Sequence, residues 1–414
     1  MPISSAAPAR PARILIVDDS AVMRALLRSV VASDRRLEVA GTASDGASAL
    51  RVVESLRPDL VLLDVEMPVM DGLNTLRQMK ARRNRIPVIM CSALTQRGAK
   101  VTIEALASGA ADYVAKPFGQ PSREAAVDSL ARDLVPKILA LTASAIGMQN
   151  QPAPHGSAFP PAPAYVSPLA GQPAHSAAGS AWPAAHVPAL PSLYPASQPP
   201  QPQPAGAPPA VVLIGVSTGG PAALDLVLPG LPANFPLPVL IVQHMPELFT
   251  KMLAERLNGR CPLRVVEASA GGPVRAGTIY IARGDWHMEI AATSPSPAST
   301  PALRLTQEPP ENHCRPAVDV LFRTGVAVYG ARVLGVVLTG MGYDGLIGSR
   351  LIRDHGGTVL AQDEATSAVW GMPGAVAQAG LAHRILPLNA IAPEILRLAG
   401  RGQREAFELR ESAV

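Results

Sequence analysis

Residues suited to ester or amide hydrolysis lie in the C-terminal half of this 414-residue chain. Ser217 stands in Gly215–Gly220 (GVSTGG), directly after an apolar run. A serine at a glycine-rich turn into a helix has free backbone N–H groups beside it, and these can stabilise an anion. A nucleophilic serine also needs a base and an acid that orients the base. The best candidates are His244, which follows an apolar run, and Asp344 in Thr339–Gly345 (TGMGYDG).

The chain order of these candidates is Ser, His, Asp, which differs from the order in α/β-hydrolases and in the two best-known serine protease folds. An ordinary lipase is therefore disfavoured, despite the GxSxG match. Each residue alone also has a plainer explanation. GVSTGG is typical of a tight βα turn or a phosphate-binding loop, a histidine at a strand end can be structural, and Asp344 can cap a helix.

A second group of candidate residues lies in the N-terminal half. Asp18 and Asp19 follow one apolar run, and Asp64 ends another. Carboxylates that meet at one sheet edge repel one another unless a divalent cation is held between them, and oxygen ligands suit Mg²⁺. Ser92 and Lys116 follow two further runs, where a hydroxyl and an ammonium can contact a phosphoryl group. The plainer alternative is a set of solvated acids at strand ends.

Both groups need a parallel sheet to position them. Short apolar runs alternate with amphipathic stretches in residues 13–140, which predicts a doubly wound parallel sheet of about five strands, and the βα alternation resumes in 209–400. In the first segment we expect strands at Arg13–Val17, Glu38–Thr42, Leu60–Asp64, Pro87–Cys91 and Asp112–Val114, with helices such as Ser20–Ala32 and Gly46–Ser55. In the second segment we expect strands at Ala210–Ile214, Pro238–Gln243, Thr278–Ala282, Arg332–Leu338 and Thr358–Gln362. Because parallel strands end at a shared edge, each group of candidates should converge.

A segment of different composition separates the two halves. No charged residue occurs between Lys137 and Asp225, and residues 151–210 contain 17 prolines. Proline at that density cannot sustain helix or sheet ladders and favours extended conformations. The predicted organisation is an N-terminal domain at 11–140, a disordered linker at 141–208, a catalytic domain at 209–400 with an extended loop at 291–301, and a charged tail at 401–414.

Composition limits the classes of function. The net charge is only +4 and aromatics are 4% of residues, so a nucleic-acid surface or a basic recognition helix is not indicated. No apolar run reaches the ~18 residues that span a bilayer. The cysteines Cys91, Cys261 and Cys314 form no disulfide framework, and the N-terminus has no apolar segment of a secretory signal. We expect a soluble cytoplasmic protein without nucleic-acid binding or membrane insertion.

Taken together, the motifs resemble a known family. DD, LLDVEMPVMDG, CSA and KPF follow the order and spacing of receiver domains in two-component response regulators. Six later runs resemble the catalytic domain of the chemotaxis response-regulator protein-glutamate methylesterase: GVSTGGPAAL, IVQHMPELFTKMLAERL, GTIYIARGDWHM, CRPAVDVLF, GVVLTGMGYDG and AQDEATSAVWGMP. This resemblance covers nearly all of 209–398. It implies a receiver domain with a five-stranded doubly wound parallel sheet, linked to an α/β methylesterase domain with a mostly parallel sheet.

The resemblance also implies roles in the catalytic domain. The triad would consist of Ser217, His244 and Asp344, with no cofactor needed for hydrolysis. The oxyanion site would be lined by Thr218, Gly219 and Met341. The substrate groove would be shaped, or the triad supported, by Arg315 and Asp319. Cys314 stands where some family members have histidine. Because it lies outside the expected triad, this departure concerns the substrate groove.

In the receiver, the resemblance makes Asp64 the phosphorylated residue. Mg²⁺ would be bound by Asp19, Asp64 and the backbone carbonyl of Glu66, with Asp18 in the outer shell. The phosphate would be sensed by Ser92 and Lys116.

The implied activity is hydrolysis of glutamate γ-methyl esters, and deamidation of glutamines, on the cytoplasmic domains of methyl-accepting chemoreceptors. The phosphodonor would be the chemotaxis histidine kinase. Phosphorylation would weaken a docked state in which the receiver covers the active site. We expect a monomer. Two alternatives remain open: a hydrolase of this fold that acts on a non-receptor ester, and a non-catalytic adaptor that responds to phosphorylation.

Overall fold

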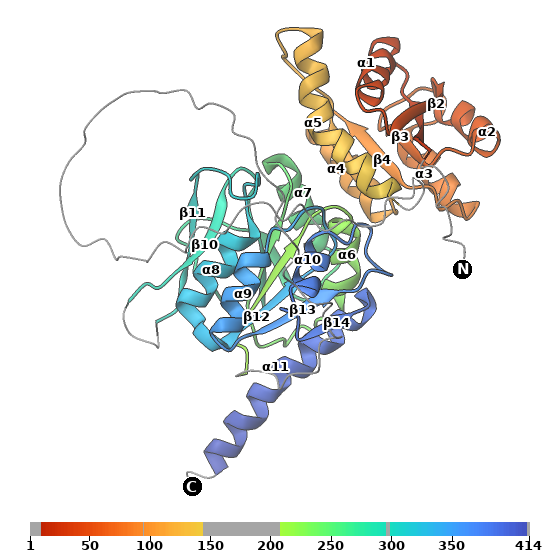
Figure 1. The fold of residues 1–414 in the computed structure, drawn as a ribbon. Helices are drawn as coiled ribbons and strands as arrows, with labels where there is room; N and C mark the ends of the chain where they lie inside the picture. Colours follow the sequence, from red (N-terminus) through yellow and green to blue (C-terminus); the bar gives the residue numbers. More distant parts are fainter. Residues whose placement is uncertain (1–9, 94, 144–207, 295–298, 412–414) are drawn as a thin grey trace, which may run out of the picture.

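The computed structural model describes residues 10–93, 95–143, 208–294 and 299–411, excluding the side chains of 401–411. These residues form two α/β units, which in the sequence precede and follow the proline-rich segment (Figure 1). Most of the expected linker, residues 144–207, lies outside the described residues. Within the described ranges, no helix is long and apolar enough to cross a membrane.

The first unit is built on a five-stranded parallel sheet in the order β2-β1-β3-β4-β5. The strands are β1 (Ala12–Val17), β2 (Leu37–Ala43), β3 (Leu60–Asp64), β4 (Val88–Ser92) and β5 (Asp112–Ala115). The helices are α1 (Ala21–Ala32), α2 (Gly46–Leu56), α3 (Gly72–Ala81), α4 (Gln96–Ala107) and α5 (Arg123–Thr142). Every residue of β3 and β4 is buried, as expected for central strands covered by helices on both faces. The predicted doubly wound sheet is confirmed.

The helices of this unit begin where the sequence supplies a capping side chain. A Ser, Asp or Thr precedes each helix, and its side chain accepts a backbone N–H from the first turn. Such caps satisfy N–H groups that have no partner inside the helix. The caps therefore fix where each βα loop ends.

The second unit is built on a seven-stranded sheet in the order β14-β13-β12-β6-β7-β9-β8, in which every pair of neighbours is parallel. Its strands are β6 (Val211–Val216), β7 (Val239–Gln243), β8 (Arg264–Glu267), β9 (Thr278–Ile281), β12 (Val333–Val337), β13 (Thr358–Gln362) and β14 (Arg384–Leu386). A separate antiparallel pair is formed by β10 (His287–Ala291) and β11 (Ala302–Thr306). The helices are α6 (Gly220–Val227), α7 (Glu247–Asn258), α8 (Val318–Tyr329), α9 (Leu346–Asp354), α10 (Met372–Gln378) and α11 (Leu388–Glu411), with short 3₁₀ turns η1 (Leu228–Gly230) and η2 (Gly330–Arg332).

The structure differs from the expectation in the smaller elements. The strands β8, β10, β11 and β14 were not predicted, because they are short and mix polar with apolar residues. The loop expected at 291–301 falls between β10, which ends at Ala291, and β11 in the sequence, and residues 295–298 of it lie outside the described residues. Helix α11 continues to Glu411, so the expected tail largely extends a helix that projects from the body of the protein (Figure 1).

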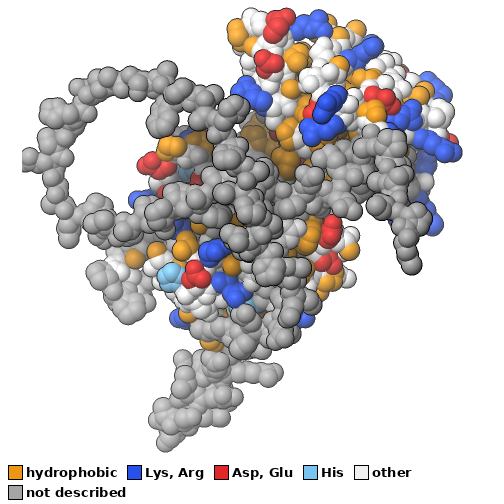
Figure 2. All heavy atoms as spheres, viewed as in Figure 1, with side chains coloured by type: hydrophobic (Ala, Val, Ile, Leu, Met, Phe, Trp, Pro, Cys, Tyr) orange, Lys and Arg blue, Asp and Glu red, His pale blue; other side chains and the backbone are white. Residues whose placement is uncertain are grey.

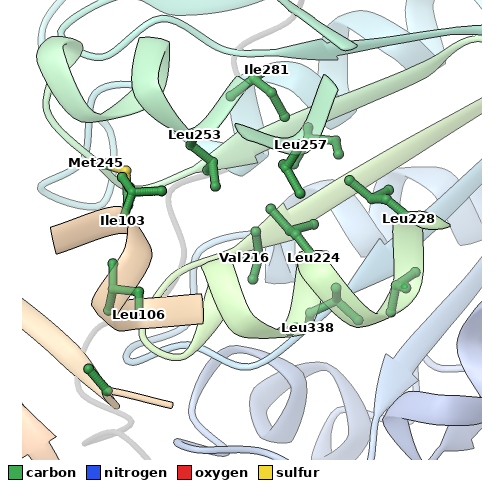
Figure 3. Close-up of a cluster of buried hydrophobic side chains, with 14 of the residues drawn as sticks. Ile103, Leu106, Val216, Leu224, Leu228, Met245, Leu253, Leu257, Ile281 and Leu338 are labelled. Atoms are coloured by element: carbon green, nitrogen blue, oxygen red, sulfur yellow. The ribbon is translucent and has the colours of Figure 1, made fainter. Parts of the chain in front are cut away.

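The two units are in direct contact. Helix α4 of the first unit packs against α6 and α7 of the second. Figure 3 shows Ile103 and Leu106 of α4 turned toward Met245, which follows β7. All three side chains are buried. In Figure 2 hydrophobic side chains appear where the units meet, whereas charges of both signs cover the visible face of the first unit. The contact between the units therefore includes an apolar patch at α4.

Candidate active site

Three adjacent strands of the second sheet position the predicted hydrolytic residues. Ser217 follows β6, His244 follows β7, and Asp344 lies in the loop after β12. Strand β6 lies between the other two in the sheet. The last paired residues of β6 and β7 are Val216 and Gln243, so Ser217 and His244 occupy matching positions one residue further on. The predicted convergence at one sheet edge is therefore observed.

The turn around Ser217 is held tightly by its neighbours. The N–H of Ser217 donates to the carbonyl of Thr339 at 3.0 Å, and the side chain of Gln243 donates to the Ser217 carbonyl at 3.0 Å. Gly219 has φ +79°, a conformation that L side chains rarely adopt. A Cβ on Gly340 would lie 2.8 Å from the Cβ of Ser217. These two glycines allow the close approach of the loops around the serine.

Backbone donors suited to an oxyanion lie directly after the serine. Gly219 precedes α6, and the N–H groups of Thr218 and Gly219 donate to no acceptor in the part of the chain that the structure describes. Such N–H groups at a helix N-terminus can stabilise negative charge. The geometry is therefore compatible with the oxyanion role expected for these two residues. Met341 lies on the β12–α9 loop and is 37% exposed.

His244 and Asp344 form a close pair. The Nε2 atom of His244 lies 2.8 Å from Oδ2 of Asp344, which is buried. The carboxylate also accepts the backbone N–H groups of Val318 and Asp319, at the first turn of α8. Burial favours the neutral acid, but the hydrogen bonds from His244 and from the α8 backbone hold the pKa of Asp344 below its ordinary value. Asp344 is therefore a fixed anion that can orient the imidazole.

Asn312 and Asp319 support this carboxylate from behind. The amide of Asn312 donates to Asp344 and to Asp319, both at 2.9 Å. Asp319 is fully buried, and its other oxygen accepts the N–H of Gly348. Burial, followed by repulsion from Asp344, raises the pKa of Asp319 to about 7. Of the two roles expected for Asp319, shaping the substrate groove or supporting the triad, this buried position favours the second.

Arg315 also has a supporting position. Its guanidinium binds the carboxylate of Asp285 and the backbone carbonyls of Gln307 and Glu308. These bonds fasten the segment that carries Asn312 and Cys314. Sequence reasoning did not identify Asn312, whose only local signal is its place two residues before Cys314 of the CRP motif.

Cys314 contacts His244, the predicted general base, although the sequence analysis assigned Cys314 to the substrate groove. Its Sγ lies 3.6 Å from Nδ1 of His244, on the opposite side of the ring from Asp344. Burial opposes a charged ring, yet Asp344 and Cys314 together raise the pKa of His244 to about 10. The departure at position 314 therefore places a thiol against the imidazole of His244, and not only in the expected substrate groove.

The cluster His244, Cys314 and Asp344 has the residue types of a zinc site, with candidate ligand atoms within 4.8 Å of one another. The hydrogen bonds of Asp344 argue against a metal. Its Oδ1 accepts from Asn312, Asp319 and Gly345, and its Oδ2 accepts from Val318 and His244. Ionised carboxylates offer about four lone-pair sites. The carboxylate therefore has no acceptor site left for a cation.

The first unit brings its predicted acidic residues together. Candidate ligand atoms of Asp18, Asp19 and Asp64 lie within 4.8 Å of one another at the ends of β1 and β3. Lys116 reaches the same place, with Nζ 2.8 Å from Asp18 and 2.8 Å from Asp64. Burial raises the pKa of Asp64, although Lys116 opposes that shift. All-oxygen donors around a small space fit Mg²⁺. The residues present thus suit the expected ion.

The other predicted receiver residues lie around this cluster. The hydroxyl of Ser92 is buried and donates to the carbonyl of Ala93 at 3.2 Å. The side chain of Glu66 is exposed and pairs with Arg97 at 3.3 Å. Ser92 ends β4, directly before the loop to α4, so the acidic cluster and the interface helix are joined by a short stretch of chain.

Specific polar and aromatic contacts tie the two units together next to Ser217. The hydroxyl of Thr218 donates to Oδ2 of Asp112 in β5, at 2.6 Å. Tyr113 stacks on Phe249 of α7, with ring centroids 4.6 Å apart and planes 25° apart. All four side chains are buried. The residue after the serine is thus bonded directly to the first unit. Sequence reasoning did not anticipate this contact.

Each half of the chain matches the model of a known protein family. Residues 14–128 match the family model of the response regulator receiver domain, and residues 212–395 match that of the CheB methylesterase. A solved Thermotoga maritima CheB methylesterase catalytic domain is 41% identical, covers 46% of this chain and 98% of its own, and has a TM-score of 0.44. The response regulator domain of Thermotoga maritima CheB is 40% identical, covers 31% and 94%, and has a TM-score of 0.28.

Curated relatives match over nearly the full length. A protein-glutamate methylesterase/protein-glutamine glutaminase of Nocardioides sp. is 47% identical over 94% of this chain and 96% of the relative. A relative with the same name from Maricaulis maris is 46% identical over 94% of this chain and 96% of its own. Another, from Trichodesmium erythraeum, is 42% identical over 94% of this chain and 99% of its own. With an N-terminal receiver domain and a C-terminal hydrolase domain, the chain belongs to the CheB family of protein-glutamate methylesterases.

Proposed function

We propose that this enzyme hydrolyses glutamate γ-methyl esters, and deamidates glutamines, on the cytoplasmic domains of methyl-accepting chemoreceptors. The observation that carries the proposal is the His244–Asp344 pair. Its members follow β7 and β12, the two strands on either side of β6, which presents Ser217. The names of the relatives support the substrate class.

The reaction follows from these residues. The His244 nitrogen that faces away from Asp344 takes the proton of Ser217, whose Oγ attacks the ester carbonyl. The N–H groups of Thr218 and Gly219 stabilise the oxyanion. His244 returns the proton to the leaving group, so methanol departs from an ester and ammonia from an amide. Water, activated by the same base, then releases the glutamate from Ser217. Asp344 stabilises the imidazolium throughout.

The receiver part of the proposal rests on the acidic cluster. Asp64 accepts a phosphoryl group from the chemotaxis histidine kinase. Mg²⁺, held by Asp19, Asp64 and the carbonyl of Glu66 with Asp18 beside them, would supply positive charge to the phosphoryl oxygens. Lys116 already lies 2.8 Å from Asp64, so its ammonium can pair with the phosphate once it forms.

Regulation rests on the interface. In this structure α4 and β5 of the receiver cover residues beside Ser217, including Thr218. We infer that this docked arrangement restricts receptor access. Phosphorylation at Asp64 shifts the chain toward an undocked state by changing the β4–α4 region that begins at Ser92.

The chemistry is tested by methanol release from methylated receptor membranes. Ser217→Ala should abolish release, whereas Ser269→Ala, an exposed serine elsewhere in the same domain, should match wild type. Unchanged methanol release by Ser217→Ala would show that Ser217 is not the nucleophile. If wild type hydrolyses a small model ester through Ser217 but releases no methanol from receptors, the substrate is a different ester.

A further inference from the structure

Cys314 contacts the imidazole nitrogen of His244 that is not bound to Asp344. The Nε2 of His244 is bound to Asp344, and Nδ1 faces Sγ of Cys314 at 3.6 Å. The distance is within hydrogen-bond range for sulfur. Cys314 is a free thiol and partly exposed, so it is open to reagents in solution.

The nucleophile needs this same nitrogen. Among the residues that the structure describes, the hydroxyl of Ser217 makes no hydrogen bond, either to His244 or to another group. Asp344 is itself held by four donors besides the histidine, so the ring cannot readily exchange partners on that side. In this state Cys314, and not Ser217, is the partner of the general base.

We propose that Cys314 is a positioning residue that competes with Ser217 for His244, and that the thiol–imidazole pair makes Cys314 the most reactive thiol of the protein. An imidazolium beside sulfur stabilises the thiolate, which is the nucleophilic form. The competition rests on the proposed role of Ser217, whereas the reactivity of Cys314 does not.

The titratable groups around the ring agree with the pair. Asp344 faces the ring from the β12–α9 loop, and Cys314 faces it from the segment before α8. Asp319 lies behind Asp344, separated from the ring. Both contacting groups raise the pKa of His244. A ring that is already protonated cannot accept the proton of Ser217, so removing Cys314 should lower this pKa and free the base at lower pH.

The first experiment measures the rate of alkylation by iodoacetamide in the full-length protein, with each cysteine followed by mass spectrometry. Sγ displaces iodide, so an S–C bond forms as the C–I bond breaks. Cys261 is the internal control, because it is also partly exposed and burial raises its pKa to about 11. We expect Cys314 to react at least ~10-fold faster than Cys261 at neutral pH, and His244→Gln to remove most of the difference.

Equal rates at the two cysteines, or no effect of His244→Gln, would overturn the reactive pair. The same measurement in Ser217→Ala is independent of catalysis, so a failure of the proposed function leaves this test intact.

The second experiment measures the pH dependence of kcat/KM for methanol release. Cys314→Ser and Cys314→Ala both remove the sulfur that contacts Nδ1 of His244, so the acid limb of the profile should move to lower pH in both. Alkylation should inactivate wild type and Cys261→Ser alike, but not Cys314→Ala. Superimposable profiles, or a limb that moves to higher pH, would show that Cys314 only packs beside the ring.

Discussion

The stacked pair Tyr113–Phe249 offers a direct way to loosen the receiver from the catalytic domain. Both rings are buried at the interface, with centroids 4.6 Å apart. Truncating Tyr113 to alanine removes the stacking, worth about 0.5–1.5 kcal/mol, together with part of the burial of a large ring. Part of that burial belongs to the receiver's own core, so we assign about 2–3 kcal/mol to docking.

That loss corresponds to a change of about 30- to 150-fold in the docking equilibrium. If the docked receiver restricts the active site, Tyr113→Ala should release methanol faster without phosphodonor, by up to the same factor, and respond less when phosphodonor is added. The assay is methanol release from methylated receptor membranes. Tyr113→Phe is the matched control, since it keeps the stacked ring and should behave as wild type.

Two control measurements on Tyr113→Ala distinguish weakened docking from loss of the receiver fold. A thermal melt shows whether the receiver of Tyr113→Ala remains folded, and cross-linking between α4 and α7 shows whether docking has weakened. If the domains separate while the basal rate stays at the wild-type level, the interface does not restrict the active site and the docking argument is wrong.

Three further predictions concern single groups. Asp64→Asn should keep the basal rate but lose the response to a small-molecule phosphodonor, because the acceptor oxygen is gone; a response equal to wild type would exclude Asp64 as the acceptor. Lys116→Ala removes the cation between two buried carboxylates, so Mg²⁺ should raise Tm more than in wild type, as seen by calorimetry. The pKa of Asp319 is about 7 when folded and ordinarily 3.8, so the folded chain binds this proton more tightly and stability falls as pH rises between those values. In urea unfolding, the free energy of unfolding of Asp319→Asn should fall less than that of wild type across this pH range, by on the order of 1–3 kcal/mol. An equal fall in the two proteins would contradict the raised pKa.

Much of the site was predictable because it depends on strand ends. Ser217, His244 and Asp344 each follow a fully buried apolar strand, and parallel strands end at a common edge. The acidic cluster of the receiver follows from the same rule. Long apolar runs therefore indicated both the sheets and the residues that converge on them.

The parts that escaped prediction depend on side chains that meet across long stretches of sequence. Asn312 and Cys314 reach the triad from an irregular segment fastened by Arg315, and no periodic pattern marks such a position. The Asp112–Thr218 hydrogen bond joins two domains across the proline-rich segment, so neither half alone indicates it. The role of Ser92 in sensing the phosphate stays a prediction; in this structure its hydroxyl donates to the carbonyl of Ala93.

The central claim is that phosphorylation at Asp64 exposes a Ser217 hydrolase. It is tested most directly by mass spectrometry of the Ser217 peptide, after rapid acid quench of the enzyme with methylated receptor fragments. The account predicts a γ-glutamyl adduct on Ser217 that increases when phosphodonor is added to wild type and does not increase in Asp64→Asn. Methanol release without any adduct on Ser217, or an adduct that is indifferent to phosphodonor, would contradict it.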